Sequence, residues 1–208
     1  MLKQDQGARG VQDAIGKALA IIPLTPNQWT MLSLLVALAA GAAIAVKSDL
    51  ALGLILFAIA ALFDMIDGAV ARARKETSAF GGFLDGVVDR FVEAIFLLSL
   101  MFVPLPFIFA DARVWLALTI FLGTCMPSFV RAYADHKGVI SKEKALALGG
   151  ICERSERLGL IIIGLAAGLA LSMDYFIYAL MLVCALSLVT IIQRVSAVAH
   201  TPRVRDLR

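Results

Sequence analysis

Four aspartates lie in or beside apolar stretches that are long enough to cross a membrane: Asp64, Asp67, Asp85 and Asp89. A carboxylate at bilayer depth costs roughly 2.5–3.5 kcal/mol on insertion scales, so four together are unfavourable by on the order of 10 kcal/mol unless they bind something. Each pair has a spacing of three or four residues, which places its members on one face of a helix. We therefore predict that both pairs face one cavity and that their ligand is a cation.

The ligand types favour a hard divalent ion. Carboxylate oxygens without a nearby pair of His or Cys favour Mg²⁺, Mn²⁺ or Ca²⁺ over zinc. The only histidines, His136 and His200, lie outside the predicted membrane spans. Four carboxylates exceed what one divalent ion needs, and a pair of ions is the arrangement that phosphoryl transfer uses to hold the attacking and leaving oxygens.

Two small residues, Gly68 and Ala71, lie on the same helical stripe as the first acidic pair. Small side chains let a bulky ligand lie against the helix between acidic positions. The alternative is that Gly68 and Ala71 only permit close helix packing. The acids on the matching face favour the ligand interpretation.

The elements that position these residues are predicted to be membrane helices. The chain has 208 residues, of which 61% are hydrophobic and 17% charged, and a mean hydropathy of +0.89, which is too apolar for an ordinary soluble domain. Because about 20 helical residues cross the hydrocarbon core, we predict an all-α integral membrane protein with six transmembrane helices, over residues 28–46, 50–74, 82–103, 113–134, 157–173 and 175–195.

Basic residues predict the orientation. Of the 19 Lys and Arg residues, 17 fall on one side of these six spans, leaving Lys47 and Arg113 for the other. The positive-inside rule then places both termini, and the acidic cavity, at the cytoplasmic side of the cell membrane. The sequence indicates neither a cleaved signal nor a nucleic-acid partner, and the isolated cysteines are interpreted as packing residues.

The chain is predicted to have three parts. Residues 1–22 show apolar positions at intervals of three or four and suit an amphipathic helix lying in the membrane interface, with a partly disordered tail as the alternative. Residues 23–196 form the six-helix catalytic domain, which begins at a helix-start signal, Thr25-Pro26-Asn27. Residues 197–208 form a basic cytoplasmic tail.

The acidic motif resembles a known family signature. The pattern Asp64-x-x-Asp67-Gly68-x-x-Ala71-Arg72, followed by Gly81-x-x-x-Asp85-x-x-x-Asp89, is similar at all eight positions to that of the CDP-alcohol phosphotransferases. That resemblance implies a transferase that moves a phosphatidyl-type group from a CDP-linked lipid to an alcohol and releases CMP. Members of the family are commonly homodimers, which implies the same for this chain.

The resemblance also implies roles for individual residues. It implies that Mg²⁺ or Mn²⁺ is held by the four aspartates, with Asp89 also the candidate general base. It implies that the CDP-lipid is bound by Gly68, Ala71, Arg72, Ser78 and Gly81. One departure is Lys75, which stands where members often have glycine.

A second cluster suggests an anionic acceptor. Arg131, Arg154 and Arg194 lie at predicted cytoplasmic helix ends, and a guanidinium group matches the oxygens of a phosphate. The alternative is positive-inside anchoring with Arg–Glu pairing. The stretches Glu-Arg-x-Glu-Arg at 153–157 and Gln-Arg-Val at 193–195 resemble the branch that makes phosphatidylinositol phosphate or archaetidylinositol phosphate, which implies that the three arginines bind inositol phosphate. Glycerol 3-phosphate is an alternative acceptor.

Two other classes compete with a transferase. Intramembrane acids also mark the pathways of divalent-cation transporters, but these acids gather toward one membrane face and no polar positions continue through the outer half of the spans. A scaffold held by acid–arginine pairs leaves the spacing of Gly68 and Ala71 unexplained. We therefore predict an enzyme of phospholipid biosynthesis.

Overall fold

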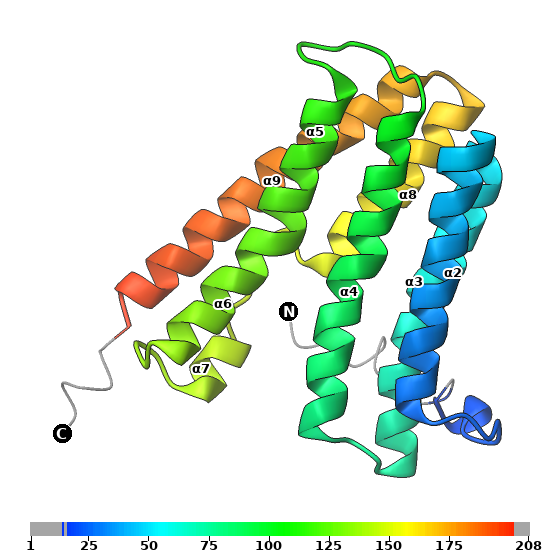
Figure 1. Cartoon of the computed structure of the whole chain (residues 1–208). Coiled ribbons are helices and arrows are strands. Elements are labelled where there is room, and N and C mark those ends of the chain that lie inside the picture. Colours follow the sequence, from blue (N-terminus) through cyan, green and yellow to red (C-terminus); the bar gives the residue numbers. More distant parts are fainter. Residues whose placement is uncertain (1–13, 15, 202–208) are drawn as a thin grey trace. The chain divides into compact units, whose positions relative to one another are not determined.

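The computed structural model describes residues 14 and 16–201, and the regular structure within them is helical apart from an isolated β-bridge between Ile108 and Ala110 (Figure 1). The chain divides into two compact units, residues 1–102 and 103–208. The all-helical fold class predicted from the sequence is confirmed.

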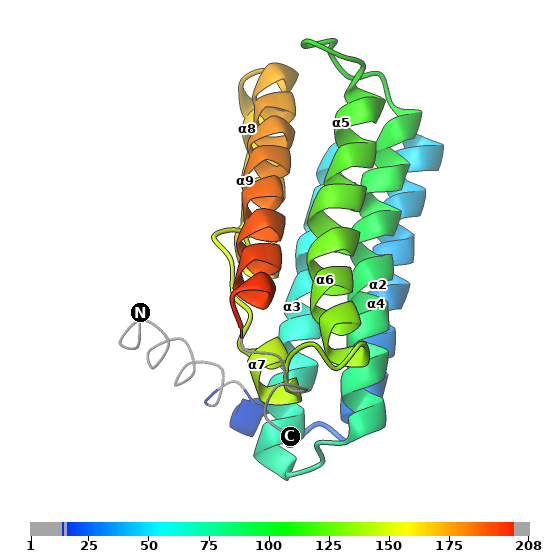
Figure 2. The same ribbon diagram turned by 90° about the vertical axis from the view of Figure 1, so that its left-hand side faces the viewer.

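The first unit contains the acidic motif. Its helices are α2 (Pro26–Lys47), α3 (Leu50–Arg74), α4 (Ala79–Ser99) and the short 3₁₀ helix η1 (Leu100–Phe102). Helix α2 packs against both α3 and α4, and the three run side by side in Figures 1 and 2. Phe57 of α3 and Phe96 of α4 stack with ring centroids 3.8 Å apart and are fully buried.

The predicted start signal of the first span is confirmed. Thr25 is the N-cap of α2, where its hydroxyl accepts from the amide of Gln28 and the Gln28 side chain accepts from the amide of Thr25. Pro26 occupies the first helical turn, where a backbone N–H would have no partner within the helix, so the lack of an N–H in proline costs no hydrogen bond.

The second unit is built around one long helix. Its elements are α5 (Ala112–Leu118), η2 (Thr119–Cys125), α6 (Met126–His136), α7 (Lys142–Leu146), α8 (Arg154–Ala170) and α9 (Met173–Ala199). Helix α9 packs against α8 and along the α5–η2–α6 segment. The buried side chains on α9, among them Phe176, Leu180 and Val183, form the middle of this unit.

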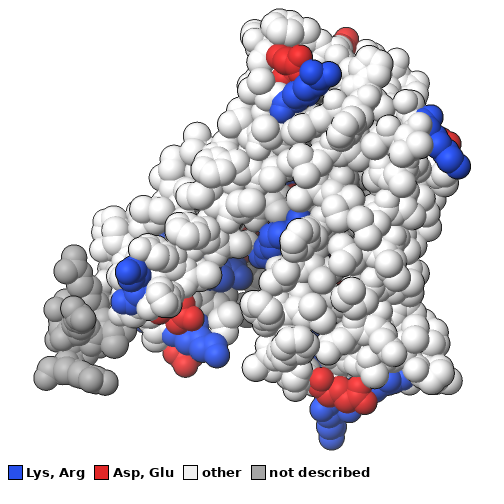
Figure 3. All heavy atoms as spheres, in the orientation of Figure 1, with Lys and Arg blue, Asp and Glu red and all other residues white. Residues whose placement is uncertain are grey.

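Four of the six predicted spans are long and apolar enough to cross a membrane: Pro26–Lys47, Leu50–Arg74, Ala112–His136 and Met173–Ala199. The other two predictions correspond to α4, which contains the ionisable Asp85, Asp89, Arg90 and Glu93, and to α8, which has 17 residues. The structure therefore supports a multi-pass membrane protein. Figure 3 agrees with this, because most of the face it shows is uncharged.

Several predicted boundaries are wrong by a few residues. Helix α4 begins at Ala79 rather than 82 because Ser78 caps it, and α8 begins at Arg154 rather than 157 behind the N-cap Glu153. Helix α9 continues to Ala199, beyond the predicted start of the tail at 197. Of the predicted interfacial helix, residues 1–13 and 15 lie outside the described residues, as do residues 202–208 of the tail.

The fourth predicted span is one continuous rod with a change of helix type. The segment Thr119–Cys125 is a π-helix, and α6 follows it with Pro127 in its first turn. Proline has no N–H to donate to the carbonyl one turn earlier, so the α-helical ladder is interrupted at this point. A π-helical segment therefore lies immediately before the turn that contains Pro127.

Lys75 ends α3 in the left-handed conformation, with φ 59°. Glycine adopts this conformation without the steric cost of a Cβ, which explains why glycine suits this position.

We expect Lys75→Gly to raise the free energy of unfolding by about 0.5–1 kcal/mol, since relief of the left-handed cost exceeds the extra chain entropy of glycine. Thermal unfolding in detergent measures this. Lys75→Ala retains the Cβ and is the control; equal stabilisation by both variants would contradict the backbone explanation.

Candidate active site

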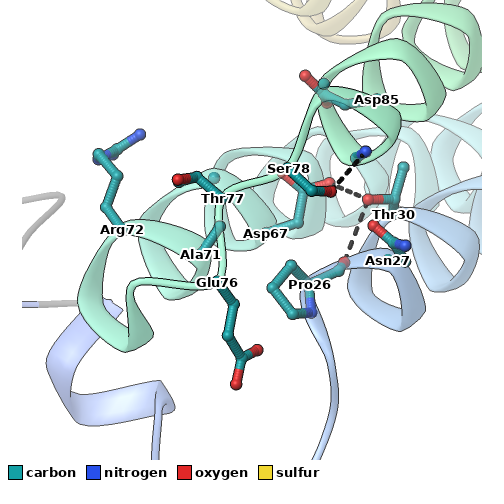
Figure 4. A pocket seen from close by; sticks show the side chains of 13 residues that line it. Pro26, Asn27, Thr30, Asp67, Ala71, Arg72, Glu76, Thr77, Ser78 and Asp85 are labelled. Atoms are coloured by element: carbon teal, nitrogen blue, oxygen red, sulfur yellow. Dashed lines mark hydrogen bonds between the residues drawn. The ribbon is translucent and has the colours of Figure 1, made fainter.

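A cavity of about 190 Å³ opens in the first unit where three helix ends meet (Figure 4). The N-terminal turn of α2, the C-terminal end of α3, the α3–α4 connection and the first turns of α4 all contribute to it. Its lining is Pro26, Asn27, Thr30, Asp67, Gly68, Ala71, Arg72, Glu76, Thr77, Ser78, Gly81, Gly82 and Asp85. All five residues predicted to bind the CDP-lipid therefore line one cavity, together with two of the predicted metal ligands.

Three of the four aspartates converge. Asp64 and Asp67 of α3 and Asp85 of α4 each offer a carboxylate oxygen, and these oxygens lie within 4.8 Å of one another. Because oxygen ligands lie about 2.0–2.6 Å from a bound Mg²⁺, Mn²⁺ or Ca²⁺ ion, oxygens on one ion are separated by no more than about 5 Å. The donor set and its spacing thus fit a hard divalent cation.

Asp89 stands apart from that group of three. It lies one turn beyond Asp85 on α4, is 8% exposed, and its Oδ2 is 3.0 Å from Nη1 of Arg90. All four aspartates are predicted from the sequence to belong to one metal site, whereas the structure distinguishes a cluster of three from a fourth, buried carboxylate beside a guanidinium group.

Gly68 makes no close contact with another helix in the part of the chain that the structure describes. Among the described residues, a Cβ added at Gly68 would meet only the Arg72 guanidinium, at 3.4 Å, and no atom of another helix within 4 Å. Gly68 and Ala71 both face the cavity. Of the two interpretations drawn from the sequence, the geometry favours small side chains that make room for a ligand over small side chains that bring helices together.

Ser78 and Gly81 shape the mouth of the cavity on α4. The Ser78 hydroxyl accepts from the amide of Gly81 at 2.9 Å, which caps the helix. A Cβ at Gly81 would lie 3.0 Å from the Ser78 hydroxyl and 3.3 Å from Oδ1 of Asn27, so a side chain here would crowd both neighbours. Two helix N-termini, those of α2 and α4, thus border the cavity, and helix N-termini attract anionic groups.

Arg74, near the C-terminal end of α3, holds the segment of residues 20–24 that precedes α2. Its guanidinium group donates to the carbonyls of Ala20 and Leu24, at 2.7 and 2.8 Å, and also to that of Ile22. These carbonyls belong to the turn just before α2. Arg74 therefore ties the end of α3 to the start of α2, the two elements that form one wall of the site.

Sequence reasoning missed Thr30. Its hydroxyl donates to Oδ2 of Asp67 at 2.6 Å, and both residues are buried (Figure 4). A usable signal was present, because Thr30 follows Asn27 by three residues and so lies on the same face of an otherwise apolar helix. Asn27, Glu76 and Thr77 also line the cavity without having been predicted as site residues.

The three arginines predicted to bind the acceptor lie in the second unit. Arg131 of α6 donates from Nη2 to the carbonyl of Leu148 at 2.9 Å. Arg194 of α9 is 5% exposed and donates from Nη1 to the carbonyl of Pro127 at 2.6 Å, and its Nη2 lies 3.9 Å from Oε1 of Glu153. Arg154 is the first residue of α8 and is partly exposed.

The segment before α8, which leads to Arg154, is held against α9 by two hydrogen bonds. The amide of Cys152 donates to the Thr190 hydroxyl at 3.0 Å, and the amide of Ile151 donates to the Gln193 side chain at 3.1 Å. Arg131 and Arg194 thus each have a structural contact with a backbone carbonyl. The Arg–Glu pairing considered from the sequence is present between Arg194 and Glu153.

Comparison with known proteins gives consistent results. Residues 23–199 match the family described as CDP-alcohol phosphatidyltransferase. The chain is 36% identical over 183 residues to archaetidylinositol phosphate synthase of Pyrococcus horikoshii, covering 88% of each protein. It is 27% identical over 203 residues to phosphatidylinositol phosphate synthase of Corynebacterium glutamicum, covering 96% of this chain and 89% of that protein.

A solved structure has the same fold. The crystal structure of Mycobacterium tuberculosis phosphatidylinositol phosphate synthase with CDP-DAG bound superposes with a TM-score of 0.74 at 24% identity, over 92% of this chain and 95% of the other. The acidic cavity, the helical fold and the match over residues 23–199 agree with one another. This chain is a membrane enzyme of the CDP-alcohol phosphatidyltransferase family.

Proposed function

We propose that this enzyme transfers a phosphatidyl-type group from a CDP-linked lipid to inositol phosphate, forming an inositol-phosphate lipid and releasing CMP. The observation that supports this most strongly is the cavity lined by Asp67, Gly68, Ala71 and Asp85, whose two carboxylates form a cluster of three with Asp64. The acceptor is supported by the relatives, which are named archaetidylinositol phosphate synthase and phosphatidylinositol phosphate synthase.

The CDP-lipid is proposed to bind in the cavity of the first unit. Gly68 and Ala71 leave space against α3, and Gly81 leaves space at the start of α4. Arg72, together with the N-termini of α2 and α4, supplies positive electrostatic potential for the diphosphate. The Ser78 hydroxyl orients the first turn of α4 by capping it.

The proposed cofactor is Mg²⁺ or Mn²⁺, with two ions per subunit. Asp64, Asp67 and Asp85 would hold a divalent ion, and Asp89 would contribute to the second. When bound, such ions neutralise the diphosphate as it is cleaved. A structure of the Mycobacterium tuberculosis relative is described as a complex with manganese and citrate.

Asp89 is the proposed general base. A general base must be able to take the proton of the acceptor hydroxyl as its oxygen attacks phosphorus. The carboxylate of Asp89 is buried on α4 and lies outside the cluster of three, so it is the acid in the motif best suited to proton transfer. The attack would form a phosphorus–oxygen bond to the lipid's phosphate and break the bond to CMP.

The membrane arrangement is proposed from charge and hydropathy. We propose that α4 and α8 complete a set of six membrane-crossing helices in the catalytic domain of residues 23–196. The distribution of Lys and Arg supports cytoplasmic termini and an active site that opens toward the cytoplasm. We also propose a homodimer, on family resemblance.

The function is tested by measuring CMP release from purified enzyme with a CDP-linked lipid and Mg²⁺. Four acceptors are compared: inositol phosphate, glycerol 3-phosphate, serine and free inositol. We expect inositol phosphate to give the highest kcat/KM. If CMP is released faster with glycerol 3-phosphate, the proposed acceptor is wrong but the proposed reaction class holds. If no acceptor gives CMP release, the proposal is contradicted.

Arg131, Arg154 and Arg194 are proposed to bind the acceptor phosphate, and Arg154, the partly exposed first residue of α8, is chosen for the test. Charge-assisted hydrogen bonds contribute about 1.5–3 kcal/mol, so Arg154→Gln should raise the acceptor KM about 10- to 100-fold. The KM for the CDP-lipid should change little. Lys144→Gln removes an exposed positive charge from α7 and is the control. Equal effects of Arg154→Gln on both KM values would indicate a structural role.

A further inference from the structure

We propose that Thr30 is a positioning residue for the metal site, acting through Asp67. The proposal rests on the function proposed above and assigns a role to a side chain on a different helix from the acidic motif. Thr30 belongs to α2, whereas the four aspartates belong to α3 and α4.

The hydrogen bond between Thr30 and Asp67 is short and buried. The hydroxyl oxygen lies 2.6 Å from Oδ2 of Asp67, and the two residues are 3% and 4% exposed. Hydroxyl-to-carboxylate bonds of about 2.5–2.7 Å are the charge-assisted kind, which are roughly twice as strong as neutral ones. In a buried site, with little competition from water, such a bond fixes the rotamer of the acceptor.

The hydroxyl has one proton and two acceptors within reach. The carbonyl of Pro26, one turn earlier on α2, lies 3.2 Å from the Thr30 oxygen, compared with 2.6 Å for Asp67. A threonine inside a helix ordinarily donates to that backbone carbonyl. Here the nearer and charged acceptor is on another helix, so the side chain links α2 to the acidic face of α3.

An aromatic contact next to Thr30 also holds α2 against the acidic end of α3. The ring of Trp29, beside Thr30, lies 5.5 Å from the ring of Phe63 on α3, centroid to centroid, and Trp29 is 6% exposed. Phe63 immediately precedes Asp64, so the contact lies within one turn of both acids on α3. An aromatic contact and a hydrogen bond thus join the same two helix turns.

Groups that orient a metal-binding carboxylate affect metal affinity without touching the metal. Loss of such an outer partner typically weakens metal binding about 10- to 100-fold. We therefore expect Thr30→Val, which is nearly isosteric but has no hydroxyl, to weaken binding of Mn²⁺ by about 10- to 100-fold. Thr30→Ser retains the hydroxyl and should bind Mn²⁺ nearly as wild type does.

Ser33 offers a matched control. It is also buried on α2, one turn further along, but its hydroxyl donates to the carbonyl of Thr30 at 2.7 Å rather than to a carboxylate. Ser33→Ala therefore removes a buried hydroxyl from the same helix without altering Asp67. Its affinity for Mn²⁺ should equal that of wild type.

The experiment measures Mn²⁺ binding by electron paramagnetic resonance on full-length protein in detergent, without substrate. Thermal unfolding in EDTA reports stability separately. The proposal predicts weak Mn²⁺ binding by Thr30→Val, and by Thr30→Ala should the valine variant not fold, with near-normal binding by Thr30→Ser and Ser33→Ala. In turnover assays, saturating Mn²⁺ should restore much of the lost rate of Thr30→Val.

Three outcomes would overturn the inference, and they are distinguishable from one another. If Thr30→Val binds Mn²⁺ as tightly as wild type, Thr30 does not position Asp67, while the proposed metal site stands. If wild type itself binds no Mn²⁺, the proposed metal site fails together with the role of Thr30. Loss of stability in EDTA without any change in Mn²⁺ affinity would indicate a merely structural residue.

Discussion

Asp89→Asn is expected to lower kcat by about a hundredfold to ten-thousandfold, the usual contribution of a general base. The asparagine has nearly the shape of the aspartate but accepts no proton at neutral pH. Because Asp89 lies outside the cluster of Asp64, Asp67 and Asp85, we expect binding of the CDP-lipid and of the first metal ion to change much less than kcat.

The measurement combines steady-state CMP release with direct binding of a CDP-lipid analogue. Asp49→Asn is a suitable control, because Asp49 caps the opposite end of α3 and asparagine caps a helix equally well. That variant removes one carboxylate at the N-terminal end of α3, away from the acidic motif at its C-terminal end, and should keep the wild-type rate. Unaltered turnover in Asp89→Asn would remove Asp89 from the mechanism.

The ion pair between Asp89 and Arg90 requires that the stability of Asp89→Asn be measured together with its kcat. Its guanidinium lies 3.0 Å from the Asp89 carboxylate, so Asp89→Asn also leaves Arg90 without that charged partner. A variant that lost stability for this reason would show a lower midpoint of thermal unfolding as well as a lower kcat. An unchanged midpoint with a lowered kcat therefore separates proton transfer from folding.

The helices of the first unit followed closely from the sequence because their end signals are local. Thr25 and Pro26 mark the start of α2, and the predicted range 50–74 coincides with α3. The start of α4 was predicted three residues late because the weakly apolar first turn gives no strong hydropathy signal. Its cap, Ser78, was identified from the family resemblance rather than as a helix boundary.

The helical faces of the acids were predictable, but their grouping was not. A spacing of three or four residues places two carboxylates on one face, and we expected all four aspartates to face one cavity; the structure groups Asp64, Asp67 and Asp85. Which acid stands apart depends on how α3 and α4 approach each other across a four-residue connection. That approach is a matter of packing, and no local pattern encodes it.

Partners distant in sequence account for the remaining misses. Thr30 meets Asp67 across 37 positions, and Arg194 meets the carbonyl of Pro127 across 67. Spacing rules apply within one helix and are silent about such pairs. The carbonyl bound by Arg194 belongs to Pro127, two residues after the π-helix ends at Cys125, and charge alone predicts neither this contact nor the change of helix type.

The second large effect is expected for Asp85→Asn. Asp85 is the only member of the three-carboxylate cluster that comes from α4. The Asp85→Asn variant therefore leaves the cluster with ligands from α3 alone. Metal ions stabilise the transition state of phosphoryl transfer by several kcal/mol, and each 1.4 kcal/mol corresponds to a factor of about ten, so we expect activity to fall roughly a thousandfold or more. The affinity for Mn²⁺ should fall with it.

Glu76→Gln distinguishes loss of a ligand from loss of charge. Glu76 lines the same cavity but does not belong to the cluster, so this variant removes one negative charge while leaving the three oxygens in place. Its effect on activity should be far smaller than that of Asp85→Asn. Raising the Mn²⁺ concentration should partly restore Asp85→Asn, because a weakened site still fills at sufficient metal. Full activity of the wild-type enzyme in excess EDTA would contradict this account, since the clustered carboxylates would then have no ion to hold.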